Sequence, residues 1–186
     1  MRMRILTATH RPSRRSSGGF TLIEAVVVMS ILLMGLLAMT STSVTVHSLR
    51  EADRERRIAT AALDSIIEDC KRISNQQVGT DPTWSQNFFA AYSPGGNPGP
   101  EYPVAGLEPR DGEASVVTVT VITDETLTDA ELGVTLGMPR DLDNDGLVSN
   151  TSVIGTASLL PVIVRVRWAG SAGGRELSQG FFVLGL

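Results

Sequence analysis

An apolar segment of about twenty residues, Phe20 to Met39, constrains this chain more than any other feature. As an α-helix it would be about 30 Å long, which matches the hydrocarbon thickness of a lipid bilayer. Its one charged residue is Glu24. The residues before it include five arginines and no Asp or Glu, an asymmetry that keeps the N-terminus in the cytoplasm and sends the rest of the chain across the membrane. We therefore predict a membrane-spanning segment at residues 20–39.

Two simpler explanations of this segment leave features unexplained. A secretory signal peptide has an apolar region of about 7–15 residues that ends in a small-x-small cleavage site. Here the segment is longer, contains Glu24, and offers only the weak match Ala38-Met39-Thr40. A plain transmembrane anchor would account for the length, but not for Glu24 or for the two glycines before Phe20.

The sequence from Ser17 to Glu24, Ser-Gly-Gly-Phe-Thr-Leu-Ile-Glu, resembles the prepilin peptidase site of type IV pilins and type II secretion pseudopilins. Members of that family have a short basic leader, a Gly, then Phe-Thr-Leu-Ile-Glu and an apolar helix. The resemblance implies that residues 1–19 are a leader, cleaved between Gly19 and Phe20 on the cytoplasmic side of a bacterial inner membrane. It also implies methylation of the new Phe20 amine, and two kinds of partner: a prepilin peptidase and other pilin or pseudopilin subunits.

The chemistry of these positions agrees with the resemblance. Gly19 has no side chain, so the backbone there can lie extended in a protease cleft. Glu24 would bring an unpaired carboxylate close to the bilayer core, which costs several kcal/mol. In the family this glutamate is thought to pair with the N-terminal amine of a neighbouring subunit. The resemblance therefore implies a role for Glu24 in filament assembly.

A helical pattern continues beyond the membrane segment. Apolar residues recur at spacings of three and four and form one stripe: Ala59, Ala62, Leu63, Ile66, Cys70 and Ile73. The opposite face is charged, and we expect the i,i+4 ion pairs Asp53–Arg57 and Glu68–Arg72 on it. We expect Cys70, the chain's only cysteine, to be a small buried residue of the stripe.

No proline interrupts this pattern between Thr21 and Asp81, so we predict one helix over residues 20–74. Many major pilins carry a Pro in the region that corresponds to Thr40-Ser41-Thr42. Its absence here favours a minor pilin or a pseudopilin.

We expect residues 75–186 to form an extracytoplasmic head. Its first part, residues 75–110, is rich in Pro and Gly and indicates loops, which the nearby aromatic residues fold back over the head. Alternating β-branched residues predict strands at 114–123, 159–168 and 175–184, the last two as a hairpin. The predicted fold class is α+β: a long N-terminal helix, transmembrane in its first half, packed on a small antiparallel sheet.

One motif in the head suggests a metal site. Asp141, Asp143 and Asp145 alternate and are followed by a Gly, which is the start of an oxygen-ligand calcium loop, with Leu147 supplying a backbone carbonyl. The full EF-hand pattern fails, because Ser152 stands where a bidentate Glu belongs. A looser calcium loop, completed by Ser149 or Asn150, and a solvated acidic turn without metal are both open. Calcium is the one cofactor that the sequence suggests, and some pseudopilins hold calcium in head loops.

Other chemistry is sparse. Both histidines, His10 and His47, precede the head, which excludes a Ser-His-Asp, Cys-His or His-ligated zinc site there. Beyond Ile73 there are five basic and thirteen acidic residues, a net charge of −8 that disfavours nucleic acid as a partner.

We expect no enzymatic activity. We predict a structural subunit of a pilus-like or secretion filament, with its head in the periplasm or outside the cell. The alternative is a membrane-anchored binding module that does not polymerise, for example an adhesive or a calcium-dependent domain.

Overall fold

The structure, a computed structural model, describes residues 21–77, 83–171 and 173–184, and the chain forms two compact units. The first unit is Met1–Thr45 and the second, here called the globular unit, is Val46–Leu186. Gly19 and Phe20, the two residues of the predicted cleavage site, lie outside the described residues.

Helix α1 comprises Leu22–Gln77, so the predicted long helix is confirmed and ends three residues beyond the expected Ser74. In the first unit, α1 includes the polar stretch Thr40-Ser41-Thr42, the region in which many major pilins have a Pro. There, Thr40 Oγ1 donates to the Leu36 carbonyl at 3.0 Å and Thr42 Oγ1 donates to the Ala38 carbonyl at 2.9 Å. Because these hydroxyls bond to the preceding turn, the polar stretch continues the helix without an unsatisfied side chain.

In the globular unit, α1 buries the stripe that its periodicity predicts. Ala59, Leu63, Ile66 and Cys70 are buried and belong to the hydrophobic core, and Ile67 joins them. The expected i,i+4 ion pairs are wrong. Glu68 pairs instead with Lys71, three residues away, and Arg54–Glu51 and Arg72–Asp69 have the same spacing, whereas Asp53 forms no ion pair among the described residues.

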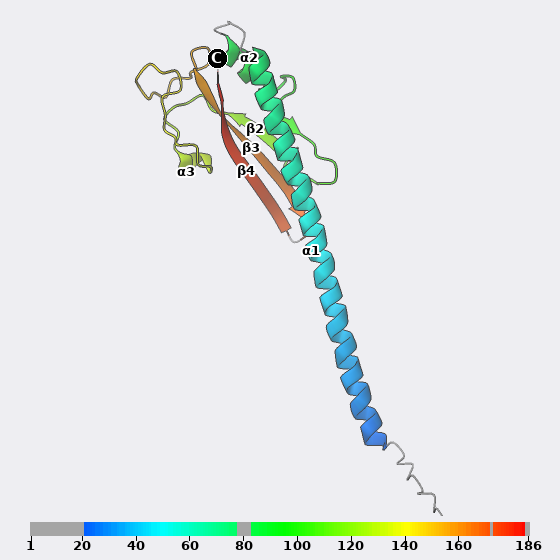
Figure 1. The fold of residues 1–186 in the computed structure, drawn as a ribbon. Coiled ribbons are helices and arrows are strands. Elements are labelled where there is room, and N and C mark those ends of the chain that lie inside the picture. Colours follow the sequence, from blue (N-terminus) through cyan, green and yellow to red (C-terminus); the bar gives the residue numbers. More distant parts are fainter. Residues whose placement is uncertain (1–20, 78–82, 172, 185–186) are drawn as a thin grey trace, which may run out of the picture. The chain divides into compact units, whose positions relative to one another are not determined.

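The sheet of the globular unit contains four antiparallel strands in the order β1-β2-β3-β4 (Figure 1). They are β1 (Glu101–Tyr102), β2 (Val117–Val121), β3 (Leu159–Gly170) and β4 (Gly173–Leu184). The predicted strands and the β3–β4 hairpin are therefore confirmed, and so is the α+β fold class. The hairpin pairs along its whole length, from Leu159 with Leu184 to Gly170 with Gly173.

Both faces of β3 are covered at its N-terminal end. Val162, Val164 and Val166 are fully buried on one face, as the alternation predicts. Ile163 on the other face is also buried, at 1% exposure, because the long connection between β2 and β3 folds over that side. This packing needs a glycine on β4: a Cβ atom at Gly180, which pairs with Ile163, would lie 2.7 Å from Leu136 Cδ2.

Two short helices lie in segments for which no helix was predicted. Helix α2 (Trp84–Ala91) falls within the Pro- and Gly-rich region, and its Trp84 and Phe88, four residues apart, are both buried. Helix α3 (Asp129–Leu132) begins with a capping box in which Thr128 and Glu131 satisfy each other's backbone N–H groups. The loop prediction was wrong at α2, where an i,i+4 aromatic pair was visible, and α3 was not predicted although its T-x-x-E sequence was visible.

Candidate functional site

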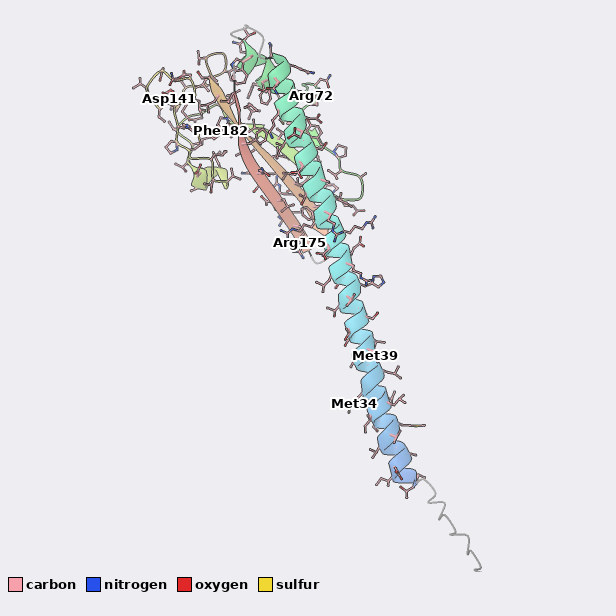
Figure 2. All side chains as sticks on the ribbon, in the orientation of Figure 1. Met34, Met39, Arg72, Asp141, Arg175 and Phe182 are labelled. Carbon is pink, nitrogen blue, oxygen red and sulfur yellow. The ribbon has the colours of Figure 1, made fainter. Side chains whose placement is uncertain are left out.

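The first candidate site is the apolar surface of α1 in the first unit. Residues 21–45 are all exposed, and the large apolar side chains include Leu22 at 84% and Met39 at 74% exposure. Met34 and Met39 are labelled on this segment in Figure 2. Among the described residues, α1 is the one helix long and apolar enough to cross a membrane. Apolar surface on all sides of a helix requires an apolar environment, either lipid or other protein.

Glu24 lies in the first turn of α1, within this apolar surface. Its backbone N–H donates to Thr21 Oγ1 at 3.3 Å, which helps to cap the start of the helix. Within the described part of the chain, no hydrogen bond or ion pair uses the Glu24 carboxylate, and the side chain is exposed. The structure therefore leaves this carboxylate available for a partner from outside the described residues.

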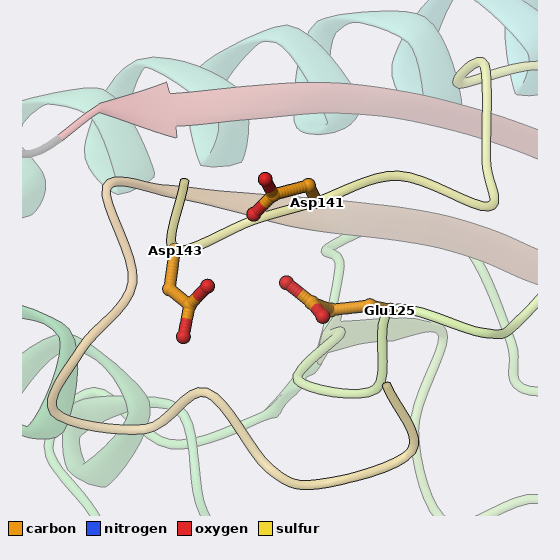
Figure 3. Close-up of side chains that lie close together, drawn as sticks. All are labelled: Glu125, Asp141 and Asp143. Carbon is orange, nitrogen blue, oxygen red and sulfur yellow. The ribbon is translucent and has the colours of Figure 1, made fainter. Parts of the chain in front are cut away.

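The second candidate site is an acidic cluster in the connection between β2 and β3. The carboxylates of Glu125, Asp141 and Asp143 face one another, with one ligand atom from each lying within 4.8 Å of the others (Figure 3). Glu125 is 1% exposed and accepts hydrogen bonds from Leu142 N at 2.6 Å and Ser149 N at 3.0 Å. The buried Glu125 carboxylate thus holds Leu142 and Ser149, on either side of the turn at residues 143–148, close together.

Asp141 shapes the turn of this loop. Its two carboxylate oxygens accept from Asn144 N at 2.6 Å and from Gly146 N at 2.9 Å. Asn144 and Gly146 have positive φ values of 63° and 87°, which Asn and Gly adopt more readily than other residues. Partial burial raises the pKa of Asp141, but the hydrogen bonds from Gly146 and Asn144 outweigh it, so the pKa lies below its usual value.

The structure brings together two of the predicted calcium ligands and not the others. Asp143 joins the cluster, and its carboxylate also accepts from Asp145 N and from Thr156 Oγ1, both at 3.2 Å. Asp145 is outside the cluster, and its Oδ1 accepts the N–H of Leu147 at 2.7 Å. Calcium ligation by these residues stays a prediction. Glu125, which sequence analysis missed, is sixteen residues before Asp141 and has no motif spacing that could reveal it.

These residues fit part of a calcium site. Ca²⁺ takes six to eight oxygen ligands, with carboxylates, backbone carbonyls and waters in flexible geometry. Glu125, Asp141 and Asp143 would supply three carboxylates, and the rest would have to come from carbonyls and water. The same carboxylates already bind backbone N–H groups, so the loop is also held together by its own hydrogen bonds.

Further acidic residues in this connection have low pKa values for similar reasons. Asp129 accepts from the backbone of Met138, Leu136 and Gly137, and these bonds lower its pKa. Thr126 lowers the pKa of Asp124, and Thr128 lowers that of Glu131. We call Asp124, Asp129, Glu131, Asp141, Asp143 and Asp145 the acidic surface.

A family model decides how the first candidate site is interpreted. The prokaryotic N-terminal methylation motif matches residues 14–40, which include the predicted cleavage site and the apolar segment with Glu24. The chain carries a prepilin-type N-terminus. A prepilin-type N-terminus implies processing by a prepilin peptidase and assembly with pilin subunits, and with the apolar helix it is consistent with single-pass membrane anchoring. This motif is the hallmark of the precursor signal of type IV pilins and pseudopilins.

The match covers the prepilin-type N-terminus and leaves the globular unit without a counterpart. No curated protein and no solved structure matches the chain.

Proposed function

We propose that this protein is a minor pilin or a pseudopilin, a structural subunit of a type IV pilus-like or type II secretion filament. The observation that carries the proposal is the matched motif followed by a helix segment that exposes apolar side chains throughout and contains Glu24. Prepilin peptidase would remove residues 1–19, and the Phe20 amine would be methylated. The apolar segment would then move from the inner membrane into the filament, with the globular unit in the periplasm or outside the cell.

Glu24 favours a filament over a plain anchor. A carboxylate in the apolar segment is costly in lipid, so a chain that only needed anchoring would be better served by an apolar residue there. A neighbouring subunit whose Phe20 amine is free after cleavage supplies the missing opposite charge. The proposed role is structural, with partners and no catalysis: the described acidic residues act as caps and loop anchors.

The first experiment is intact-mass and N-terminal analysis of the protein from its native membrane. We expect a chain that begins at Phe20 and carries a methyl group. A chain that still begins at Met1 would favour the plain anchor. A chain that begins near Ser41 would mean an ordinary secreted domain, and the filament proposal would be wrong.

The second experiment replaces Glu24. Glu24→Ala and Glu24→Gln should leave the protein in the membrane but reduce its recovery in sheared or sedimented filaments roughly tenfold or more, because a buried ion pair loses one partner. Ser30→Ala is the matched control, since Ser30 lies in the same segment and its hydroxyl bonds only to the Val26 carbonyl. Equal assembly of the Glu24 variants and the control would contradict a role for Glu24.

A second candidate function is a membrane-anchored, calcium-dependent binding module that does not polymerise. The cluster of Glu125, Asp141 and Asp143 favours it. If calcium binds, excess Ca²⁺ at about 100 times its Kd should stabilise the globular unit by about 2.7 kcal/mol, and Mg²⁺ should have less effect. Asp143→Asn should remove the Ca²⁺ effect, whereas Asp64→Asn on α1 should keep it. No Ca²⁺ effect on thermal unfolding would leave the loop as a metal-free acidic turn.

A further inference from the structure

An exposed run of arginines lies on α1 at the start of the globular unit. Arg50, Arg54, Arg56 and Arg57 are all exposed, and we call them the arginine segment. Arg54 forms an ion pair with Glu51 at 3.4 Å, but within the described residues the other three form none. Such a set of free arginines on one helix is a surface suited to carboxylates or phosphates.

The neighbouring acidic residues neutralise this segment only in part: four exposed arginines against the exposed Glu51 and Asp53 leave a net charge of +2. Glu51 and Asp53 point outward with the arginines, whereas Glu55 is turned to the β-hairpin. Its carboxylate accepts from Trp168 Nε1 at 3.3 Å and from Ser171 N at 3.0 Å. A surface groove connects the segment with the hairpin: Arg56 lines it together with Arg175 of β4, and Asp53 and Glu176 lie in the same groove.

The acidic surface carries the opposite charge. Between residues 124 and 145 there are seven acidic residues and one basic residue, Arg140. Four of these carboxylates have pKa values below their usual range, because N–H and hydroxyl groups of the loop donate to them. They therefore stay ionised, and their hydrogen bonds hold them in fixed positions at the surface.

The loop at residues 141–145 of the acidic surface and the arginine segment lie at opposite ends of the β3–β4 hairpin, whereas α3 lies between them, where its Leu132 carbonyl accepts from Arg165 of β3. The acidic loop is attached where β3 begins, since the Leu142 carbonyl accepts from Leu159 N at 3.1 Å. Glu55 contacts Trp168, nine residues further along β3, which corresponds to about 30 Å of strand. Figure 2 shows the same separation in its labels: Arg175 lies at the turn end of the hairpin and Asp141 at the far end.

Helix α1 gives an independent measure of that distance. Ser74 Oγ donates to the carbonyl of Leu184, the residue paired with Leu159, so Ser74 marks the acidic end of the unit. From Glu55 to Ser74 is nineteen residues, or about 30 Å of helix. Two surfaces that far apart cannot neutralise each other within one copy.

We propose that the arginine segment of one copy docks on the loop at residues 141–145 of the acidic surface of a second copy. The contact is head to tail, because each copy uses two different surfaces. Contacts of this kind generate open helical assemblies when they do not close into rings. The inference rests on the proposed filament function and adds a contact to it: copies that touch through these surfaces are offset by about 30 Å along the helix direction.

Anionic lipid is a weaker candidate for the binding partner of the arginine segment. It would account for the arginines but would repel the acidic surface, whereas a second copy accounts for both with one contact. The contact should also weaken with salt, because charges at exposed surfaces are screened over about 10 Å at 0.1 M ionic strength.

Zero-length cross-linking tests the contact directly. Lys71 is the only lysine in the chain, so Arg57→Lys adds an amine while keeping the charge. Filaments assembled from isotopically light and heavy full-length protein would be treated with a carbodiimide, which joins an amine to a touching carboxylate. We expect cross-linked peptides in which position 57 of one isotopic form is joined to Asp141, Asp143 or Asp145 of the other. Lys71, which pairs with Glu68 in the same copy, is the internal control.

Charge reversal provides a second measurement on the full-length protein. Arg56→Glu with Arg57→Glu should reduce the assembled fraction roughly tenfold, because like charges then face each other. Asp143→Arg with Asp145→Arg should do the same, and all four changes in one chain should restore assembly. Lys71→Glu with Arg72→Glu, on the same helix but outside the segment, should leave assembly unchanged.

The outcomes separate this inference from the proposed function. Filaments that form normally but show no link between copies at position 57 would overturn the docking and leave the filament function intact. Loss of binding to anionic vesicles by the Arg56→Glu, Arg57→Glu protein, without any such link, would assign the arginines to lipid instead. A wild-type chain that is never cleaved at Phe20 and never assembles would overturn both.

Discussion

Helix α1 contains two segments with the same backbone conformation and different chemistry. In residues 22–45 every side chain is exposed and the large ones are apolar. In residues 46–77 one stripe is buried in the core of the globular unit, and the opposite face is charged. The comparison shows that helix geometry does not decide what a helix contacts. The pattern of side chains does: the second segment completes its packing within the chain, whereas the first requires lipid or other subunits.

The energetic difference follows from the same pattern. Burying a Leu, Ile or Met side chain contributes about 1.5–3 kcal/mol relative to exposure in water. In the second segment this free energy already contributes to folding of the globular unit. In the first segment this free energy is gained only on insertion into a membrane or a filament. Those are the environments to which a prepilin-type N-terminus leads, and this is why the motif and the apolar segment occur together.

The largest expected effect comes from truncating a leucine in each segment. Leu63→Ala, at a 5% exposed position, should lower the free energy of unfolding of the globular unit by about 2–5 kcal/mol. Leu37→Ala, at a 69% exposed position, should leave it unchanged. Both tryptophans, Trp84 and Trp168, are buried in the globular unit, so their fluorescence during urea unfolding of the full chain in detergent measures this difference.

The comparison would fail if Leu37→Ala destabilised the globular unit as much as Leu63→Ala. That result would mean that the two segments fold as one cooperative unit. Leu37→Ala should instead act on assembly, where its side chain is expected to be buried between subunits.

A smaller effect is expected at high pH, from a cluster of three buried polar groups: Cys70 of the second segment, Tyr92 and Tyr102. Burial raises the pKa of the Cys70 thiol to about 11, and burial raises the pKa of Tyr102 to about 12. The buried hydroxyl of Tyr92 interacts with both groups, and its pKa is also raised. In the described residues neither tyrosine hydroxyl makes a hydrogen bond of regular geometry. The folded state therefore binds these protons more tightly than the unfolded state does.

The sign follows from that difference in proton binding. The stability contributed by Cys70 is fully present below about pH 9 and is lost as the pH rises towards 11, by about 3 kcal/mol at most. Urea unfolding of the full chain at a series of pH values measures this loss, and Cys70→Ala should reduce it.

Thiol reagents should label Cys70 only on unfolding, but should label Thr60→Cys, an exposed position of the same segment, in the folded protein. Rapid labelling of native Cys70 would contradict its burial.

A third change acts where the second segment meets the hairpin. Glu55→Gln replaces the charged acceptor of Trp168 Nε1 and Ser171 N, and should lower the free energy of unfolding by about 1–2 kcal/mol. Glu51→Gln is the matched control, because Glu51 is exposed and only pairs with Arg54. Equal effects of the two changes would mean that the Glu55 contacts do not hold the hairpin on the helix.

The sequence predicted the elements whose residues repeat locally and missed the features that depend on tertiary packing. The stripe from Ala59 to Ile73 and the alternation along β3 are local patterns, and both gave the right element and the right buried face. Glu125 could not be predicted as a partner of Asp141, because only the folded connection between β2 and β3 brings them together. Helix α2 was missed because the prolines and glycines around it dominate the composition of its region.

The smallest effect is expected on the charged face of the second segment. Arg72 pairs with Asp69 at 3.0 Å, but both side chains are about half exposed, so Arg72→Ala should lower the free energy of unfolding by less than about 0.5 kcal/mol. Added salt should remove even that difference, because water and ions already screen the pair. A loss above about 1 kcal/mol in urea unfolding would show that this face packs against protein in the folded chain. The comparison would then need revision, since the second segment would have two packed faces and the first none.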